Sequence, residues 1–91
     1  MQNPEIRYIT HVKKASNLDV IEICNPGQPW SPVSKKDAIH DIVSKTYQYL
    51  VNWGDFTTEI KAVVSNINHK YLRTDKDGSA RNNLEELPNC L

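Results

Sequence analysis

A single helix start, at Ser34, is the strongest local signal in this sequence and constrains the fold more than any other feature. Residues 25–29 before it contain two prolines and a glycine, so they must form a loop. The Ser34 hydroxyl can cap the helix, and Asp37 follows three residues later, as in a capping box. Val33 and Ala38 are spaced for a hydrophobic staple. We expect one amphipathic helix of about 11 residues here, close to the average in globular proteins.

Short segments of β type occupy most of the remaining chain. They cover residues 7–13, 18–24, 47–51, 57–65 and 70–74. In the second segment Val20 and Ile21 break the alternation, which fits either burial on both faces or a bulge. The connections are short, and short connections favour hairpins. We therefore expect an α+β domain of order β-β-α-β-β-β, with a mostly antiparallel five-stranded sheet, the helix across one face and a short C-terminal helical turn after Asn83.

The length of the chain suits one domain, since 91 residues cannot enclose a second core. We expect residues 1–6 to form a flexible arm and residues 7–91 to form the domain. So small a domain buries a limited share of its surface, and a dimer or a bound partner would stabilise it. The longest apolar runs are three residues, and the first residues lack the features of a signal peptide. We expect a cytoplasmic protein without membrane contact.

Two cysteines, Cys24 and Cys90, are too few for a disulfide framework. In a reducing cytosol we expect both to be thiols, with Cys24 as a small buried side chain at the end of a strand. A disulfide between Cys24 and Cys90 remains the alternative.

Residues that could support catalysis or bind zinc are scattered along the chain. The three histidines and two cysteines show none of the CxxC, CxxH or HExxH spacings of zinc sites. No serine lies in a G-x-S-x-G elbow, and the three glycines are too far apart for a phosphate-binding loop. We therefore expect a protein that is not an enzyme and that uses no cofactor or metal.

One segment partly matches the calcium-binding loop of an EF-hand. Its oxygen-bearing residues fall at positions one, three, five and twelve, as Asp75, Asp77, Ser79 and Glu86. Position six is Ala80, where the loop needs a glycine, and the segment follows a strand instead of a helix. We favour turn hydrogen bonds for the aspartates and a capping role for Glu86.

The segment of residues 61–81 is basic although the whole chain has no net charge. Its basic residues are Lys61, Lys70, Arg73, Lys76 and Arg81. Alternation along a strand predicts that Tyr71 and Arg73 lie on one side. On an exposed sheet such side chains can stack on single-stranded bases and bind phosphates, or can anchor a protein partner. The alternative is that Tyr71 belongs to the core and the charges are solvated.

Aromatic residues also lie in expected loops, as Trp30, Trp53 and Phe56. An indole in a loop usually closes one end of a core, with its N–H hydrogen-bonded. If they are exposed, Trp30 and Trp53 are candidate anchors for a partner. The strand at residues 70–74 could also pair with another chain if it lies at a sheet edge.

An ordered set of short motifs resembles a known family. The motifs are Trp30-Ser31-Pro32, Tyr47-Gln48-Tyr49, Lys70-Tyr71-Leu72-Arg73-Thr74, Asp77-Gly78, Asn83-Leu84 and Leu87-Pro88. Together they resemble the small bacterial and phage proteins classified as domain of unknown function 3892, from Ile9 to Pro88. The resemblance implies a compact α+β domain and carries no activity, cofactor or catalytic residue.

We predict a non-enzymatic interaction domain that binds a protein partner, or itself, through a sheet edge or loop aromatics. The alternative is a nucleic-acid-binding accessory protein that uses the basic segment, with Lys61, Lys70, Tyr71, Arg73 and Lys76 as contacts. The occurrence of the family in phages suggests, by analogy, that such an accessory protein acts on host machinery.

Overall fold

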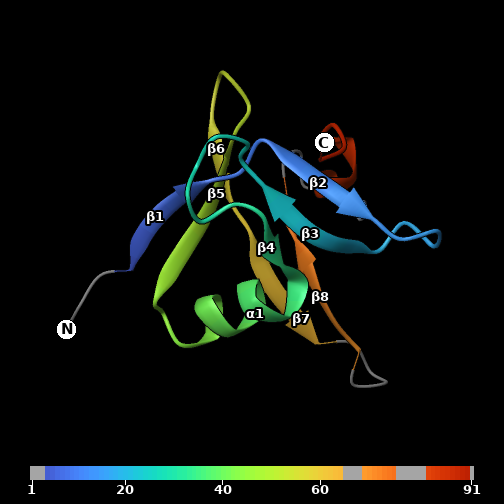
Figure 1. Cartoon of the computed structure of the whole chain (residues 1–91), viewed down its shortest axis with the longest axis horizontal. Coiled ribbons are helices and arrows are strands. Elements are labelled where there is room, and N and C mark those ends of the chain that lie inside the picture. The colour runs from blue at the N-terminus through green and yellow to red at the C-terminus, as the bar shows by residue number, and fades with distance from the viewer. Residues whose placement is uncertain (1–3, 65–68, 76–81, 91) are drawn as a thin grey trace.

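The computed structural model describes residues 4–64, 69–75 and 82–90 of the chain. One helix, α1 (Lys35–Val43), lies among three small sheets, and a 3-10 helix, η1 (Asn83–Glu86), lies near the C-terminus (Figure 1). The expected α+β class is confirmed. The expected single five-stranded sheet is wrong, because the strands divide into sheets of three, three and two.

The first sheet consists of β1 (Glu5–Tyr8), β5 (Tyr47–Asn52) and β6 (Thr57–Glu59), in the order β1-β5-β6. β5 and β6 form an antiparallel hairpin. β1 pairs with β5 in parallel, which brings two segments that are distant in the sequence side by side (Figure 1). Since β1 begins at Glu5, the expected flexible arm over residues 1–6 was too long: its last two residues belong to the sheet.

The second sheet is antiparallel and consists of β2 (His11–Lys14), β3 (Val20–Cys24) and β4 (Val33–Ser34), in that order. Lys13 lies opposite Glu22, but the next residue of β2 lies opposite Val20. Ile21 is therefore one extra residue in β3, and the break in alternation between Val20 and Ile21 marks a bulge.

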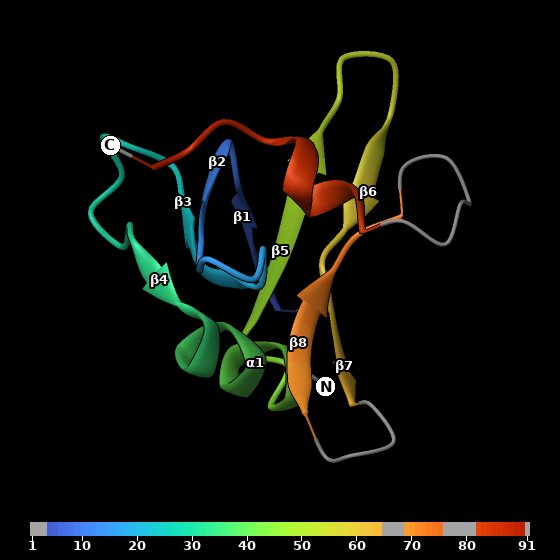
Figure 2. The same ribbon diagram turned by 90° about the vertical axis from the view of Figure 1, so that its right-hand side faces the viewer.

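The third sheet is an antiparallel pair of β7 (Lys61–Val64) and β8 (Lys70–Arg73). Figure 2 shows this pair beside α1. Two of the expected strands, over residues 7–13 and 57–65, each pass from one sheet into another. The N–H of Ile9 donates to a carbonyl of the first sheet at 2.8 Å, whereas the N–H of Thr10 donates to the second sheet at 2.9 Å. Ile60 separates β6 from β7 in the same way, and Ile9 and Ile60 are both buried in the core.

The helix forms as its sequence predicts, with the Ser34 hydroxyl accepting a hydrogen bond from the Asp37 N–H at 3.1 Å. It has nine residues and ends at Val43. α1 packs against β3, β5, β7 and β8, so a single helix contacts strands of all three sheets (Figure 2). Neither this helix nor any other within the described ranges is long and apolar enough to cross a membrane.

The C-terminal segment lies along the outer edge of β2 and is covalently attached to β3. The N–H of Val12 donates to the Pro88 carbonyl, and the N–H of Cys90 donates to the Val12 carbonyl, both at 2.9 Å. Cys24 and Cys90 form a disulfide, so the expectation of two thiols is wrong. The two sulfur atoms meet because the C-terminal segment pairs with β2, and the neighbouring strand β3 ends at Cys24.

Candidate functional site

β1 exposes two large apolar side chains at the edge of its sheet. Ile6 is 53% exposed and Tyr8 is 47% exposed. These residues are two apart in one strand, so their side chains lie on the same face, and Arg7 lies on the other. No described strand pairs with the outer edge of β1. An unpaired edge that carries exposed apolar side chains is a typical surface for the addition of another strand.

The backbone of β1 uses alternate residues to pair with β5. The N–H groups of Glu5 and Ile9 donate toward β5 at 3.4 and 2.8 Å. By alternation, the backbone groups of Ile6 and Tyr8 face the open edge. There the Tyr8 carbonyl accepts one hydrogen bond, from the side-chain amide of Asn25 at 2.9 Å. A carbonyl oxygen can accept two, so this contact leaves room for a second donor.

A cluster of aromatic residues holds β1 through Arg7. Its guanidinium carbon lies 3.4 Å from the centre of the Tyr47 ring and 4.9 Å from the centre of the Trp30 ring. One guanidinium nitrogen donates to the Tyr49 hydroxyl at 3.2 Å, and that hydroxyl donates to Asp41 of α1 at 2.7 Å. The cluster therefore joins β1, β5, the loop before the helix and α1.

The hydroxyl of Tyr49 is an ionisable group in this cluster, and its pKa is shifted. Its side chain is fully buried in the core. Burial, and secondarily the hydrogen bond to Asp41, raises the pKa of Tyr49 far above its usual range, although Arg7 acts in the opposite direction. A phenol that retains its proton so firmly is suited to a structural hydrogen bond and is a poor base near neutral pH.

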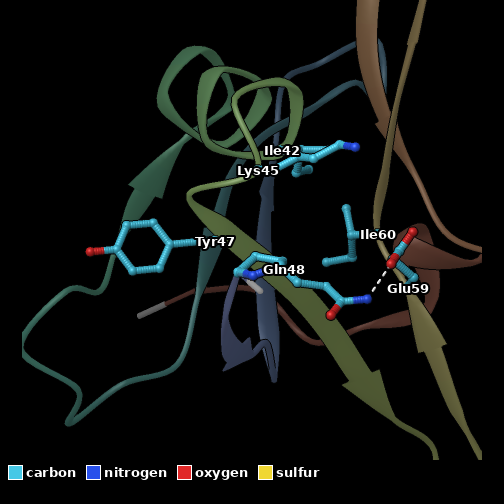
Figure 3. Close-up of a pocket in the computed structure, with 7 residues that line it drawn as sticks. Ile42, Lys45, Tyr47, Gln48, Glu59 and Ile60 are labelled. Carbon is cyan, nitrogen blue, oxygen red and sulfur yellow. Dashed lines mark hydrogen bonds between the residues drawn. The ribbon is translucent and has the colours of Figure 1, made fainter. Parts of the chain in front are cut away.

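A hollow of about 330 Å³ adjoins the start of β1 (Figure 3). It is lined by Pro4, Ile42, Lys45, Tyr47, Gln48, Glu59 and Ile60. In Figure 3 the side chains of Gln48 and Glu59 point toward each other, and the Gln48 amide donates to the Glu59 carboxylate. Tyr47 points away from this pair. The carboxylate in the hollow is thus already hydrogen-bonded within the chain.

The third sheet brings part of the predicted basic site together. Lys61 lies directly opposite Arg73, and Val63 lies opposite Tyr71, so these four residues share one face of the pair. The prediction that Tyr71 and Arg73 lie on one side is confirmed by this register. Lys70 lies on the other face of the sheet. Lys61 is exposed, whereas Tyr71 and Arg73 are half-buried.

Several of these side chains contact other residues of the same chain. Arg73 forms an ion pair with Asp75 at 2.8 Å. The Tyr71 ring stacks on His69, with 6.3 Å between ring centres. Lys76 and Arg81 lie outside the described residues.

Two of the four residues considered as calcium ligands, Asp75 and Glu86, lie in the part of the chain that the structure describes. Asp75 faces Arg73, and the Glu86 carboxylate accepts a hydrogen bond from the Asn83 side chain in η1. The residue that caps the start of η1 is Asn82, whose side chain accepts from the Leu84 N–H, so the cap lies one residue before the expected Asn83. The contact of Glu86 with Asn83 joins two side chains and is not a backbone cap. Asp77, Ser79 and Ala80 lie outside the described residues. Among the residues that the structure describes, no three acidic, histidine or cysteine side chains are grouped to hold a metal ion.

Both tryptophans pack against the core and are only partly exposed. Trp30 lies edge-on to Tyr49, with ring centres 6.4 Å apart. The indole N–H of Trp53 donates to the Thr58 hydroxyl at 2.9 Å. Of the loop aromatics, Phe56 has the more exposed side chain, at 44%.

Ile6, Arg7 and Tyr8 were not predicted as candidate site residues, because Ile6 fell in the expected arm and Arg7 and Tyr8 fell at the start of the expected strand over residues 7–13. The available signal was the alternation of apolar and polar residues, which begins at Ile6. This signal is weak over four residues, and the strand depends on pairing with the distant β5.

These features define a small, disulfide-linked α+β domain with exposed side chains on short strands. The chain belongs to the family DUF3892, a protein family of unknown function, whose model matches residues 8–88. The resemblance inferred from the motifs is therefore confirmed. Comparison with curated proteins and with solved structures finds no match.

Proposed function

We propose that this protein is a non-catalytic interaction domain that pairs with a protein strand through the outer edge of β1. The observation that carries this proposal is the exposure of Ile6 and Tyr8 on an edge with no described neighbour. The cluster around Arg7 supports it, because a strand held rigidly loses little conformational entropy when it binds.

The partner that best fits this edge is a second copy of the chain. In an antiparallel pair centred on Arg7, the outward-facing backbone groups of Ile6 would meet those of Tyr8 in the other copy. Each pair would then place a β-branched side chain opposite an aromatic one, which is a favourable combination across strands. A dimer would also add buried apolar surface to a domain with a small core.

Light scattering after size exclusion tests this proposal. We expect the wild-type chain to show twice its mass of 10.4 kDa at high concentration. Ile6→Lys and Tyr8→Lys should each return the protein to a monomer, because a charge at the edge opposes strand pairing. Phe56→Lys is the matched control, since it adds the same charge at an exposed aromatic residue in a loop. A wild-type monomer, or a dimer that only Phe56→Lys disrupts, would contradict pairing through β1.

The state of Tyr49 supports a role without catalysis. The cluster next to β1 is the obvious place for acid–base chemistry, but the raised pKa of Tyr49 keeps its proton on the hydroxyl. Asp41 in turn accepts that hydroxyl's hydrogen bond. Both groups are thereby engaged in supporting β1.

A second candidate function is nucleic-acid binding by the outer face of β7 and β8. One observation favours it: Lys61 and Arg73 lie directly opposite each other, so two basic side chains share one face of the pair, although Arg73 is also paired with Asp75. Tyr71 on the same face could stack on a base. An accessory role for a phage protein that acts on host machinery would be one form of this function.

A gel-shift titration with single-stranded DNA at increasing salt tests the second candidate. Binding should weaken steeply with salt, and Lys61→Ser should lower both the affinity and the salt dependence. Lys13→Ser is the control, since it removes an exposed lysine that belongs to a different sheet, in β2. Equal effects of the two substitutions would argue against this face as the binding site.

The cytoplasmic location stays a proposal, and the disulfide bears against it. Cytosolic thiols are usually reduced, whereas Cys24 and Cys90 are bonded to each other. Rapid acid quenching of cells, followed by alkylation of the free thiols of this protein, would show whether the two cysteines are reduced in the cell. Two alkylated cysteines would support the cytoplasm, and none would support an oxidising compartment.

A further inference from the structure

A groove between α1 and β8 has no role in the proposed pairing through β1. Its volume is about 430 Å³. The groove is lined by Lys35, Lys36, Ile39, His40, Val43 and Lys70. None of these residues belongs to β1, so this surface can be tested separately from the proposed dimer.

The floor of the groove is aliphatic. Val43 is 71% exposed, although it extends the same helix face as the half-buried Ile39. Val64, at the end of β7, is 58% exposed and lies opposite Lys70 on the sheet face that carries the buried Leu72. Val43 is therefore an uncovered apolar side chain of the groove, and Val64, which does not line the groove, is a second exposed apolar side chain on the third sheet.

The rim of the groove is positively charged. Among the described residues, Lys36 and Lys70 form no ion pair, whereas Lys35 is bonded to Asp19 at 2.6 Å. In a helix of about 3.6 residues per turn, the acidic Asp37 and Asp41 lie on a different face from the groove residues. None of the described residues that line the groove is acidic.

We propose that this groove binds an acidic segment of a partner protein. An aliphatic side chain of that segment would cover Ile39 and Val43, and its carboxylates would lie near Lys36 and Lys70. This combination follows from charge complementarity around an apolar floor. Nucleic acid fits less well, because His40 supplies the one ring among the described lining residues and Tyr71 lies on the other face of β8.

Fluorescence anisotropy with a labelled synthetic peptide tests the proposal. The probe is a short peptide that combines glutamate and leucine, compared with a peptide in which every glutamate is replaced by lysine and with one in which every leucine is replaced by serine. We expect binding of the first peptide, with affinity lower by about tenfold or more for each altered peptide. Equal binding of the glutamate and lysine peptides would overturn the proposal.

Variants of the protein locate the binding. Val43→Glu and the pair Lys36→Glu with Lys70→Glu should each weaken binding about tenfold or more. These side chains are exposed, so the fold should persist, which the thermal unfolding midpoint verifies. Lys13→Glu is the matched control for charge, and Ile6→Lys is the control for the β1 edge. Unchanged binding in both groove variants would overturn the proposal, whatever the outcome of the dimer experiment.

Two further probes distinguish the other possible occupants. Vesicles of phosphatidylglycerol and single-stranded DNA would be added as competitors of the labelled peptide. Stronger binding to either than to the glutamate–leucine peptide would overturn the assignment of a protein segment. Chemical-shift changes centred on the methyl groups of Ile39 and Val43 during peptide titration would support it.

Discussion

Arg7 connects the edge strand β1 to the rest of the molecule. Its guanidinium lies over the Tyr47 ring and near that of Trp30, and it donates to the Tyr49 hydroxyl. Planar guanidinium groups stack on aromatic rings better than ammonium groups do. The strand proposed as the interaction edge is therefore anchored by a side chain on the face opposite Ile6 and Tyr8.

Replacement of Arg7 tests this dependence. Arg7→Gln should lower the free energy of unfolding by about 1–2 kcal/mol, because it removes the cation–π contacts. Arg7→Lys, which keeps the charge but not the planar group, should fall between the wild type and Arg7→Gln. Urea denaturation followed by tryptophan fluorescence measures both. Wild-type stability of Arg7→Gln would show that the cluster does not hold β1.

Tyr49 makes stability depend on pH at the alkaline end. Its folded-state pKa is raised, so the unfolded phenol loses its proton first as the pH increases. The contribution of Tyr49 should be fully present below about pH 10 and should then decline, by at most about 1.4 kcal/mol per pH unit. Urea denaturation of the wild type and of Tyr49→Phe between about pH 9 and pH 11 measures the difference. Parallel pH curves for the two proteins would contradict the raised pKa.

At the scale of single elements, α1 shows how closely local sequence can specify structure. Ser34, Asp37 and the loop before them predict where the helix begins, and the Ser34 hydroxyl forms the expected capping bond.

Ser34→Ala should cost about 1 kcal/mol of stability, because it leaves a helix N–H without its side-chain acceptor. Ser34→Asp should retain most of that energy. Thermal unfolding followed by circular dichroism compares the variants, and equal midpoints for Ser34→Ala and the wild type would refute the prediction.

The strands were predicted less completely than the helix. Alternation placed Tyr71 and Arg73 on one face, and the register of β7 and β8 confirms it. The same rule treated residues 57–65 as one strand, although Ile60 divides it between two sheets. Alternation describes which side chains share a face, but it contains no information about which strand lies next to another.

For the whole molecule, the Cys24–Cys90 disulfide closes most of the chain into one loop, with a sequence separation of 66. A loop of this length restricts the unfolded chain strongly, which corresponds to about 4 kcal/mol of stabilisation. Cys24→Ser with Cys90→Ser should therefore lower the free energy of unfolding by an amount of this order. Urea denaturation with and without reductant measures it.

The reductant provides the control for the disulfide. Reduced wild type should match the double serine variant, and the variant itself should not respond to reductant. Equal stability of the oxidised and reduced wild type would show that the bond contributes little. Mass spectrometry without reduction checks that the bond is present before each measurement.

By itself, this sequence determined the α+β class, the helix start at Ser34, the hairpins and the shared face of Tyr71 and Arg73. Each of these follows from residues that are neighbours in the chain, so short-range hydrogen bonds and side-chain alternation are enough to specify it. Only the tertiary structure decided that β1 pairs in parallel with β5, that the strands bend at Ile9 and Ile60, and that Cys24 meets Cys90. These outcomes are choices among partners distant in sequence. They depend on which arrangement buries the most apolar surface around one helix, and that competition involves the whole chain at once.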